Sequence, residues 1–257
     1  MNAPGLQTLL ARVLADPRSA RELHEAPEVF AARHGATQEQ VSELAALGGE
    51  GLDTAVMITA AKRRRRVHNA FPATFALAEQ LPAAQPLLHF TDFGEQPTSP
   101  EGSREVGRRL QLAVRELDDH DDPDGLAVLG ELVAFETLWY EVRAAAQTTW
   151  GSTPGCPTLA PGARLAAFSR PIAEVHRRVL AGSPWRDVGR AGTHYTVQAG
   201  EGTRIRVRRV PTALWTLLTS CDGHTSAARL AALLELPPQR VERVLTDLVE
   251  QGVLIGN

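Results

Sequence analysis

The side chains best suited to metal chemistry are spread thinly along the chain. No two of its histidines stand four residues apart, the spacing at which a helix brings two ligands to one face, and no HxH or HExxH motif occurs. We therefore expect no metal ligand and no cofactor in this chain. The eight histidines are His24, His34, His68, His89, His120, His176, His194 and His224.

Two short segments have the composition of a catalytic or calcium site. His89 and Asp92, in LLHFTDF, contain the groups of a general-base pair, but a predicted loop position favours ordinary surface groups. The stretch DDHDDPDG, 118–125, lacks the alternating oxygen ligands and terminal Glu of a calcium loop and is interpreted as a solvated acidic turn. Because no phosphate loop or G-x-S-x-G elbow occurs either, we predict no catalytic residue and no enzyme.

Composition narrows the class of protein and its compartment. Lys and Arg total 27 against 30 Asp and Glu, and the net charge of -3 argues against a generally basic nucleic-acid binder. Cys156 and Cys221 are too few for a disulfide framework, which fits a reducing compartment. There is no signal-peptide pattern and no apolar window of about 20 residues, so we expect a cytoplasmic protein without membrane attachment.

The densest positive charge is the run 62–66 in KRRRRVHNAFPATFALA. Apolar residues at helical spacing place it on a helix that begins near Asp53 and ends before Pro72. Arg64 and Arg65 point away from the apolar stripe. They form either a solvated face or a docking edge for an acidic partner.

The other two arginines of the run lie beside the apolar stripe. At 100° per residue, Arg63 and Arg66 can pack their stems on it, but their guanidinium groups then need an anion. Glu131 and Glu136, on a later helix, are the predicted partners, and we expect at least one such ion pair.

The first part of the chain is predicted to be all-helical. Cap signals at Asp16, Ala26 and Thr37 indicate three short helices between residues 6 and 47. Residues 82–103 are interpreted as a long surface connection, and helical patterning resumes over 105–117. Residues 126–149 form a strong helix that is apolar around much of its girth, as expected of a central helix.

Beyond a Pro- and Gly-rich patch at 151–162 the chain changes character. HYTVQ and TRIRVRRV flank a short Gly-containing connection and predict a β-hairpin. Three helices, 212–219, 225–234 and 238–251, and a short strand, 253–255, follow.

The predicted fold class is therefore α+β: an N-terminal all-helical domain followed by a C-terminal winged-helix-like module, a β-hairpin and then three helices. The predicted limits are 1–150 for the helical domain (a small element, 1–47, and a docking domain, 50–150), 151–184 for a linker and connecting helix, and 185–257 for the module.

A helical and winged-helix transcription regulator is the main alternative, because the second and third of these helices have the order of a helix-turn-helix. Over residues 193–257, however, seven arginines face six carboxylates, which leaves little charge for phosphate neutralisation. The would-be recognition helix also carries Glu242, Asp247 and Glu250. Nucleic acid is therefore not the expected partner.

A hairpin followed by three helices, with ALWTLLTSCDGHTSAARLAALLELPPQRVERVLTDLVEQGVL, resembles the module that recognises leader sequences of ribosomally made, post-translationally modified peptides. The pyrroloquinoline-quinone peptide chaperone typifies this fold. The resemblance implies that an extended leader adds a strand to the hairpin edge and lies against the third helix. The implied peptide-binding residues are Ile205, Val207 and Arg209, or their alternating neighbours, with Arg240, Val244 and Asp247.

The first domain carries a second resemblance. KRRRRVHNAFPATFALAEQL, LHFTDFGEQP and GELVAFETLWYEVR are similar to the helical domain of partner proteins of multinuclear non-heme iron-dependent oxidative enzymes. The resemblance implies a heterodimer in which the partner enzyme holds the iron. The implied docking residues are Arg64, Arg65, Phe71, Pro72 and Trp139.

Together these resemblances imply a non-catalytic subunit that binds the leader of a precursor peptide and presents it to the iron enzyme. Residues 1–47 are more similar to a small helical element found in leader peptides and in the small subunit of aromatic ring-opening dioxygenases, which is a third interpretation. The role of these residues, the residue of the precursor that is modified and the stoichiometry of the complex stay open.

Overall fold

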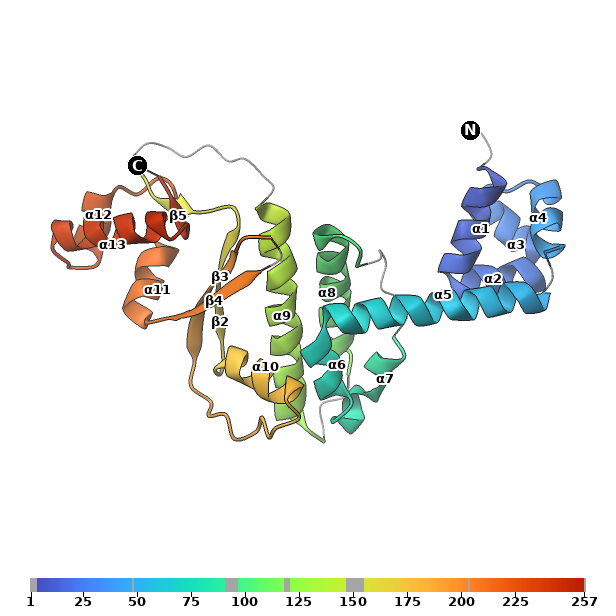
Figure 1. Ribbon diagram of the computed structural model, residues 1–257, viewed down its shortest axis with the longest axis horizontal. Helices are drawn as coiled ribbons and strands as arrows, with labels where there is room; N and C mark the ends of the chain where they lie inside the picture. Colours follow the sequence, from blue (N-terminus) through green and yellow to red (C-terminus); the bar gives the residue numbers. More distant parts are fainter. Residues whose placement is uncertain are drawn as a thin grey trace. The chain divides into compact units, whose positions relative to one another are not determined.

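The structure is a computed structural model that describes residues 4–47, 49–90, 97–117, 121–146, 155–202 and 204–256. The contacts within the chain divide it between Asn69 and Ala70 into two compact units. Figure 1 shows the elements of each unit. The predicted limits of the three domains do not coincide with this boundary, and they stay a prediction.

The first unit is a small helical bundle. Asp16 accepts a hydrogen bond from the N–H of Arg18, and Thr37 forms a capping box with Gln40. The third predicted cap, Ala26, also precedes a helix but makes no side-chain capping bond. The described part of this unit has four short helices where three were predicted, because each of the three predicted caps starts one helix and a further helix precedes them from Leu6. They are α1 (Leu6–Ala15), α2 (Pro17–Glu25), α3 (Pro27–His34) and α4 (Gln38–Ala45). The core of this unit consists of Leu9, Val13, Ala20, Leu23, Phe30, Val41, Leu44, Leu52 and Val56.

Helix α5 (Gly49–Ala70) carries the basic run, as predicted, and begins four residues earlier than expected. Its start packs into the core of the first unit through Leu52 and Val56. Pro72 then starts α6 (Pro72–Ala78), with Phe71 between the two helices. The predicted helix break before Pro72 is confirmed.

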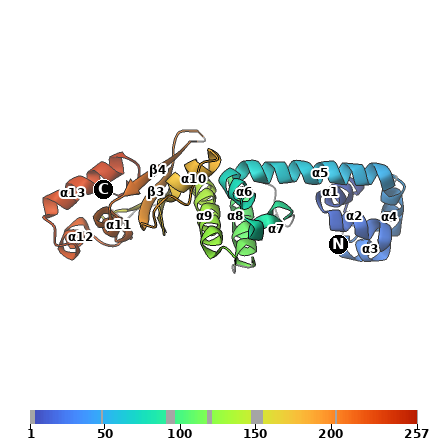
Figure 2. The same ribbon diagram turned by 90° about the horizontal axis from the view of Figure 1, so that it is seen from below.

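The second unit opens with helices. The segment predicted as a long connection contains η1 (Pro82–Ala84) and α7 (Gln85–Leu88), and α8 (Pro100–Arg115) starts inside it because Ser99 caps the N–H of Gly102. Helix α9 (Pro123–Ala145) lies between α8 and a β-sheet (Figure 1; Figure 2). It is buried on both sides, as its apolar girth predicted.

The sheet has three antiparallel strands in the order β2 (Ala163–Phe168), β3 (Thr193–Ala199) and β4 (Ile205–Val210). The predicted hairpin, β3 and β4, is confirmed. Strand β2 was missed, and with α10 (Ile172–Leu180) it occupies the segment predicted as a linker and connecting helix. One face of the sheet packs on α9, where the rings of Phe168 and Tyr195 lie 5.8 and 6.4 Å from that of Phe135.

The other face of the sheet meets the C-terminal helices (Figure 1). These are α11 (Thr212–Thr219), α12 (Ala227–Leu233) and α13 (Pro238–Glu250), close to their predicted bounds. Strand β5 (Leu254–Ile255) pairs with β1 (Thr158–Leu159), which was missed. The predicted α+β class is confirmed, and no helix in the described ranges is long and apolar enough to cross a bilayer. The core of this part consists of Val210, Leu217, Leu218, Cys221, Leu230, Ala231, Val241, Leu245, Leu248, Val253 and Leu254.

Candidate functional site

The candidate site is the open edge of β4 together with one side of α13. The N–H of Gly200 donates to the carbonyl of Arg204 (2.8 Å), which fixes the hydrogen-bond parity of the hairpin. Because bonded and non-bonded pairs alternate in an antiparallel ladder, Arg206 and Arg208 bond to β3. Ile205, Val207 and Arg209 therefore direct their backbone groups outward. No strand within the described residues pairs with this side of β4.

The side chains of β4 alternate between the two faces of the sheet. Val210 lies in the core formed with α11 to α13, and the guanidinium of Arg208 donates to the side-chain oxygen of Gln251 at the end of α13. Arg206 shares this face because it is two residues from Arg208. In register with Val207 and Arg209 are Val197 and Tyr195, whose face packs toward α9.

This alternation distinguishes the two sets of side chains that were predicted for β4. The side chains of Ile205, Val207 and Arg209 face away from α13, and those of their alternating neighbours Arg206 and Arg208 face the helix. The physical reason is that half-buried Ile205 and Val207 extend the apolar face that covers α9. These residues offer backbone groups to a ligand, and the arginines offer side chains.

The predicted helix residues form one line along α13. Arg240, Val244, Asp247 and Gln251 follow the spacing i, i+4, i+7 and i+11, which keeps them on one side of the helix. Gln251 lies against the sheet, since it accepts from Arg208 and its carbonyl accepts from the amide of Gln198 (3.4 Å). Arg240 and Asp247 are exposed, and Val244 is half-buried. The line of these four residues therefore begins at Gln251, beside the sheet, and continues along α13 to Arg240.

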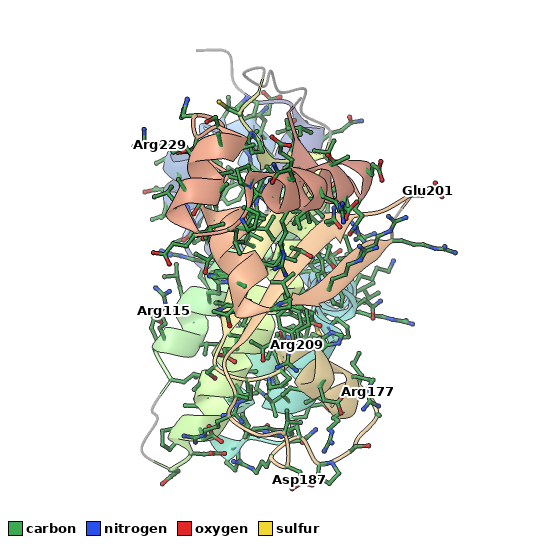
Figure 3. All side chains as sticks on the ribbon, turned by 90° about the vertical axis from the view of Figure 1, so that its left-hand side faces the viewer. Arg115, Arg177, Asp187, Glu201, Arg209 and Arg229 are labelled. Atoms are coloured by element: carbon green, nitrogen blue, oxygen red, sulfur yellow. The ribbon has the colours of Figure 1, made fainter. Side chains whose placement is uncertain are left out.

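Positive charge dominates this edge. Arg204, Arg206, Arg208 and Arg209 are exposed, and in the described part of the chain no carboxylate lies within 4.0 Å of any of them. In Figure 3, Glu201 marks the turn of the hairpin and Arg209 its other end.

A pocket of about 380 Å³ lies at the Val210 end of β4. Its lining consists of Gly192, Thr193, His194, Arg209, Val210, Pro211 and Thr212.

The residues predicted to dock a partner are distributed differently. Phe71 is fully buried and its ring lies 5.6 Å from that of Tyr140, so it belongs to the core and not to an exposed surface. Trp139 is half-buried between the rings of Phe135 (5.5 Å) and His176 (4.9 Å).

The remaining predicted docking residues are accessible to different degrees. Arg65 is exposed, whereas Arg64 and Pro72 are half-buried. Docking through these residues stays a prediction.

Glu136 has a role that sequence reasoning missed. Its carboxylate is fully buried and accepts from the N–H groups of Ala73 (2.9 Å) and Thr74 (3.1 Å) and from the Thr74 hydroxyl (2.7 Å). His176 Nε2 lies 3.2 Å from the same carboxylate. Glu136 thus caps the first turn of α6 from a distant helix. The signal in the sequence was a carboxylate within an apolar helix, which requires partners when buried.

The arginines that were expected to pair with Glu131 and Glu136 belong to the other unit. Arg63 donates to the backbone carbonyl of Ala15. Glu131 accepts from the N–H of Ser169 (2.6 Å). The ion pairs of Arg63 and Arg66 with these glutamates stay a prediction.

The acidic turn is not simply solvated, which corrects its interpretation. Asp122 caps the N–H of Gly125 (3.0 Å) and pairs with Arg186. Asp124 pairs with Arg170 (2.6 Å) and with Arg190 (2.7 Å). The hydrogen bond from Arg186 holds the pKa of Asp122 below its usual range against the opposing effect of burial. Two carboxylates of the turn therefore anchor arginines from a distant part of the chain.

Within the described ranges, no three His, Cys, Asp or Glu side chains gather closely enough to hold a metal ion. Asp92 and residues 118–120 lie outside the described residues. The chain matches no protein-family model, and no curated protein matches it.

Proposed function

We propose that this chain is a non-catalytic, cytoplasmic subunit that binds the leader of a ribosomally made precursor peptide and presents it to an iron-dependent oxidative enzyme. The observation that carries the proposal is the open edge of β4 beside the exposed line of α13. A leader in extended conformation would pair with the outward backbone groups of Ile205, Val207 and Arg209. Its side chains on one face would then meet Arg206, Arg208 and α13.

An open edge strand needs protection from pairing with other copies of the protein. Strand β4 carries exposed arginines at 206, 208 and 209, and charged side chains on an edge disfavour pairing between identical strands because like charges repel. The same charges do not prevent pairing with a different peptide. This combination supports a ligand-binding edge.

The oxidative step belongs to the partner in this proposal. The partner enzyme supplies the iron and the oxygen chemistry, and this chain holds the precursor. Binding the leader raises the effective concentration of the rest of the precursor at the iron site without any chemistry in this chain. The similarity of 62–81 and 130–143 to the partner proteins of such enzymes supports the heterodimer.

The test is co-expression of the full chain with an iron oxygenase and a short precursor encoded beside its gene. Val207→Pro removes an outward N–H from the edge, where proline is tolerated, and so blocks strand addition. Val207→Thr keeps the N–H and the β-branched shape and serves as the control. We expect the proline variant to lose co-purification with the precursor and the precursor's mass change, and the threonine variant to retain both.

Two results would contradict the proposal. The first is a proline variant that folds normally by circular dichroism and binds the precursor as the unmodified protein does. The second is a salt-sensitive shift of genomic DNA in a gel, which would favour the transcription regulator.

A further inference from the structure

The arginines of the β4 edge are arranged in a regular array. Arg204, Arg206 and Arg208 stand two residues apart and so share the face toward α13, whereas Arg209 lies on the opposite face. All four side chains are exposed, and in the described part of the chain only that of Arg208 has a hydrogen-bond partner, Gln251. Arg204 and Arg206 are therefore available to a ligand, and Arg208 keeps the guanidinium N–H groups that do not bond to Gln251.

We propose that the ligand of this edge is an acidic extended peptide with Asp or Glu at alternate positions. This inference rests on the proposed function, because it specifies which peptide the edge selects. Side chains on one face of a strand repeat every ~6.6 Å, and an added strand has the same repeat. Carboxylates at every second residue of the ligand thus stand opposite Arg204, Arg206 and Arg208, and arginine binds carboxylates with two parallel hydrogen bonds.

The surroundings of the array strengthen this selection. Arg240 on α13 adds a fifth cationic side chain to the four arginines of the edge. The turn of the hairpin and the line along α13 contribute two acidic side chains, Glu201 and Asp247. Complementary charge mainly raises the association rate and the specificity, so neutral or basic peptides should bind more weakly.

The array favours a peptide over a nucleic acid. The outward N–H and C=O groups of Ile205, Val207 and Arg209 match those of another strand, whereas a phosphate backbone cannot satisfy the carbonyls. A nucleic acid is nevertheless the alternative that the experiment must separate.

The experiment measures fluorescence anisotropy of two labelled decapeptides with the full-length protein. One peptide alternates Glu with Thr and the other alternates Gln with Thr, so they differ only in charge. The Glu peptide should bind about tenfold more tightly at low salt, and added salt should remove the difference. Arg206→Gln and Arg208→Gln should each weaken binding of the Glu peptide by about two- to fivefold.

Arg229→Gln is the matched control, because Arg229 is also exposed but lies on α12, away from the Glu201 end of the hairpin (Figure 3). It should leave both affinities unchanged. Val207→Pro should abolish binding of both peptides, because it acts on strand pairing and not on charge.

The outcomes separate this inference from the proposed function. Equal binding of the two peptides, lost in Val207→Pro, would refute the acidic preference and leave the peptide-binding edge standing. Binding of the Glu peptide that survives Val207→Pro would show that the charges act without strand addition and would overturn both. Tighter binding of oligothymidine than of the Glu peptide, or no binding of either peptide, would also overturn the inference.

Discussion

Replacing Glu136 by Ala tests whether a distant carboxylate holds the start of α6. The substitution leaves the buried N–H groups of Ala73 and Thr74 without their acceptor. Each unsatisfied buried donor costs about 1–3 kcal/mol, so the free energy of unfolding should fall by about 3–5 kcal/mol. Glu136→Gln keeps one oxygen acceptor but turns an amide NH₂ toward the other donors, and we expect a loss of about 2 kcal/mol.

The assay is urea unfolding followed by tryptophan fluorescence. All four tryptophans, Trp139, Trp150, Trp185 and Trp215, belong to the second unit, so the signal reports the unit that contains Glu136. Glu141→Ala, a half-buried glutamate of the same helix, is the control and should change stability by less than about 0.5 kcal/mol. If Glu136→Ala cost no more than this control, the capping role would be refuted.

Three further predictions concern packing, thiol reactivity and acid stability. Gly107→Ala should destabilise the second unit by about 2–3 kcal/mol in urea unfolding, because the new Cβ would lie 2.2 Å from a threonine hydroxyl on α9. Gly130→Ala is the control: its new Cβ would have no neighbour nearer than 3.8 Å, so the substitution should be neutral or stabilising. Burial raises the pKa of Cys221 to about 12, so mass spectrometry after iodoacetamide treatment at neutral pH should show the other, half-buried cysteine labelled and Cys221 unlabelled until the protein unfolds. The lowered pKa of Asp122 stabilises the fold fully above its unfolded-state pKa of about 3.9, and this stabilisation disappears as the pH falls through the lower folded value. Arg186→Gln should therefore flatten the loss of stability in this acid range, and an unchanged acid profile would contradict the assignment.

The C-terminal helices and the hairpin could be predicted because their signals are local. Helix α11 follows Pro211, α13 carries a regular apolar stripe, and the hairpin has two β-type runs around a glycine-containing turn. Strand β2 could not be predicted in the same way. Its sequence ARLAAF has no clear alternation, and its partner β3 lies beyond an intervening helix. Only tertiary pairing makes this segment a strand.

The position of the candidate site could be predicted only in part. The hairpin and the third helix that form it were predicted, but the face of each β4 side chain was left open between two alternatives. IRVRRV has apolar residues at 205 and 207, and the sequence does not say which face of the sheet they cover. The partners of Glu136 and Asp124 could not be predicted either, because they lie 40 or more residues away in the sequence.

The position of α9 determines how this protein can be divided. Because one helix supports α8 on one side and the sheet on the other, the strands and the helices before them share a single interior. A fragment cut near residue 163 would leave the apolar side of α9 uncovered in water, and such fragments aggregate. Strand β4 therefore cannot be transferred to another protein on its own: a transfer would have to carry the whole span 70–257, or proceed by substitutions on β4 alone.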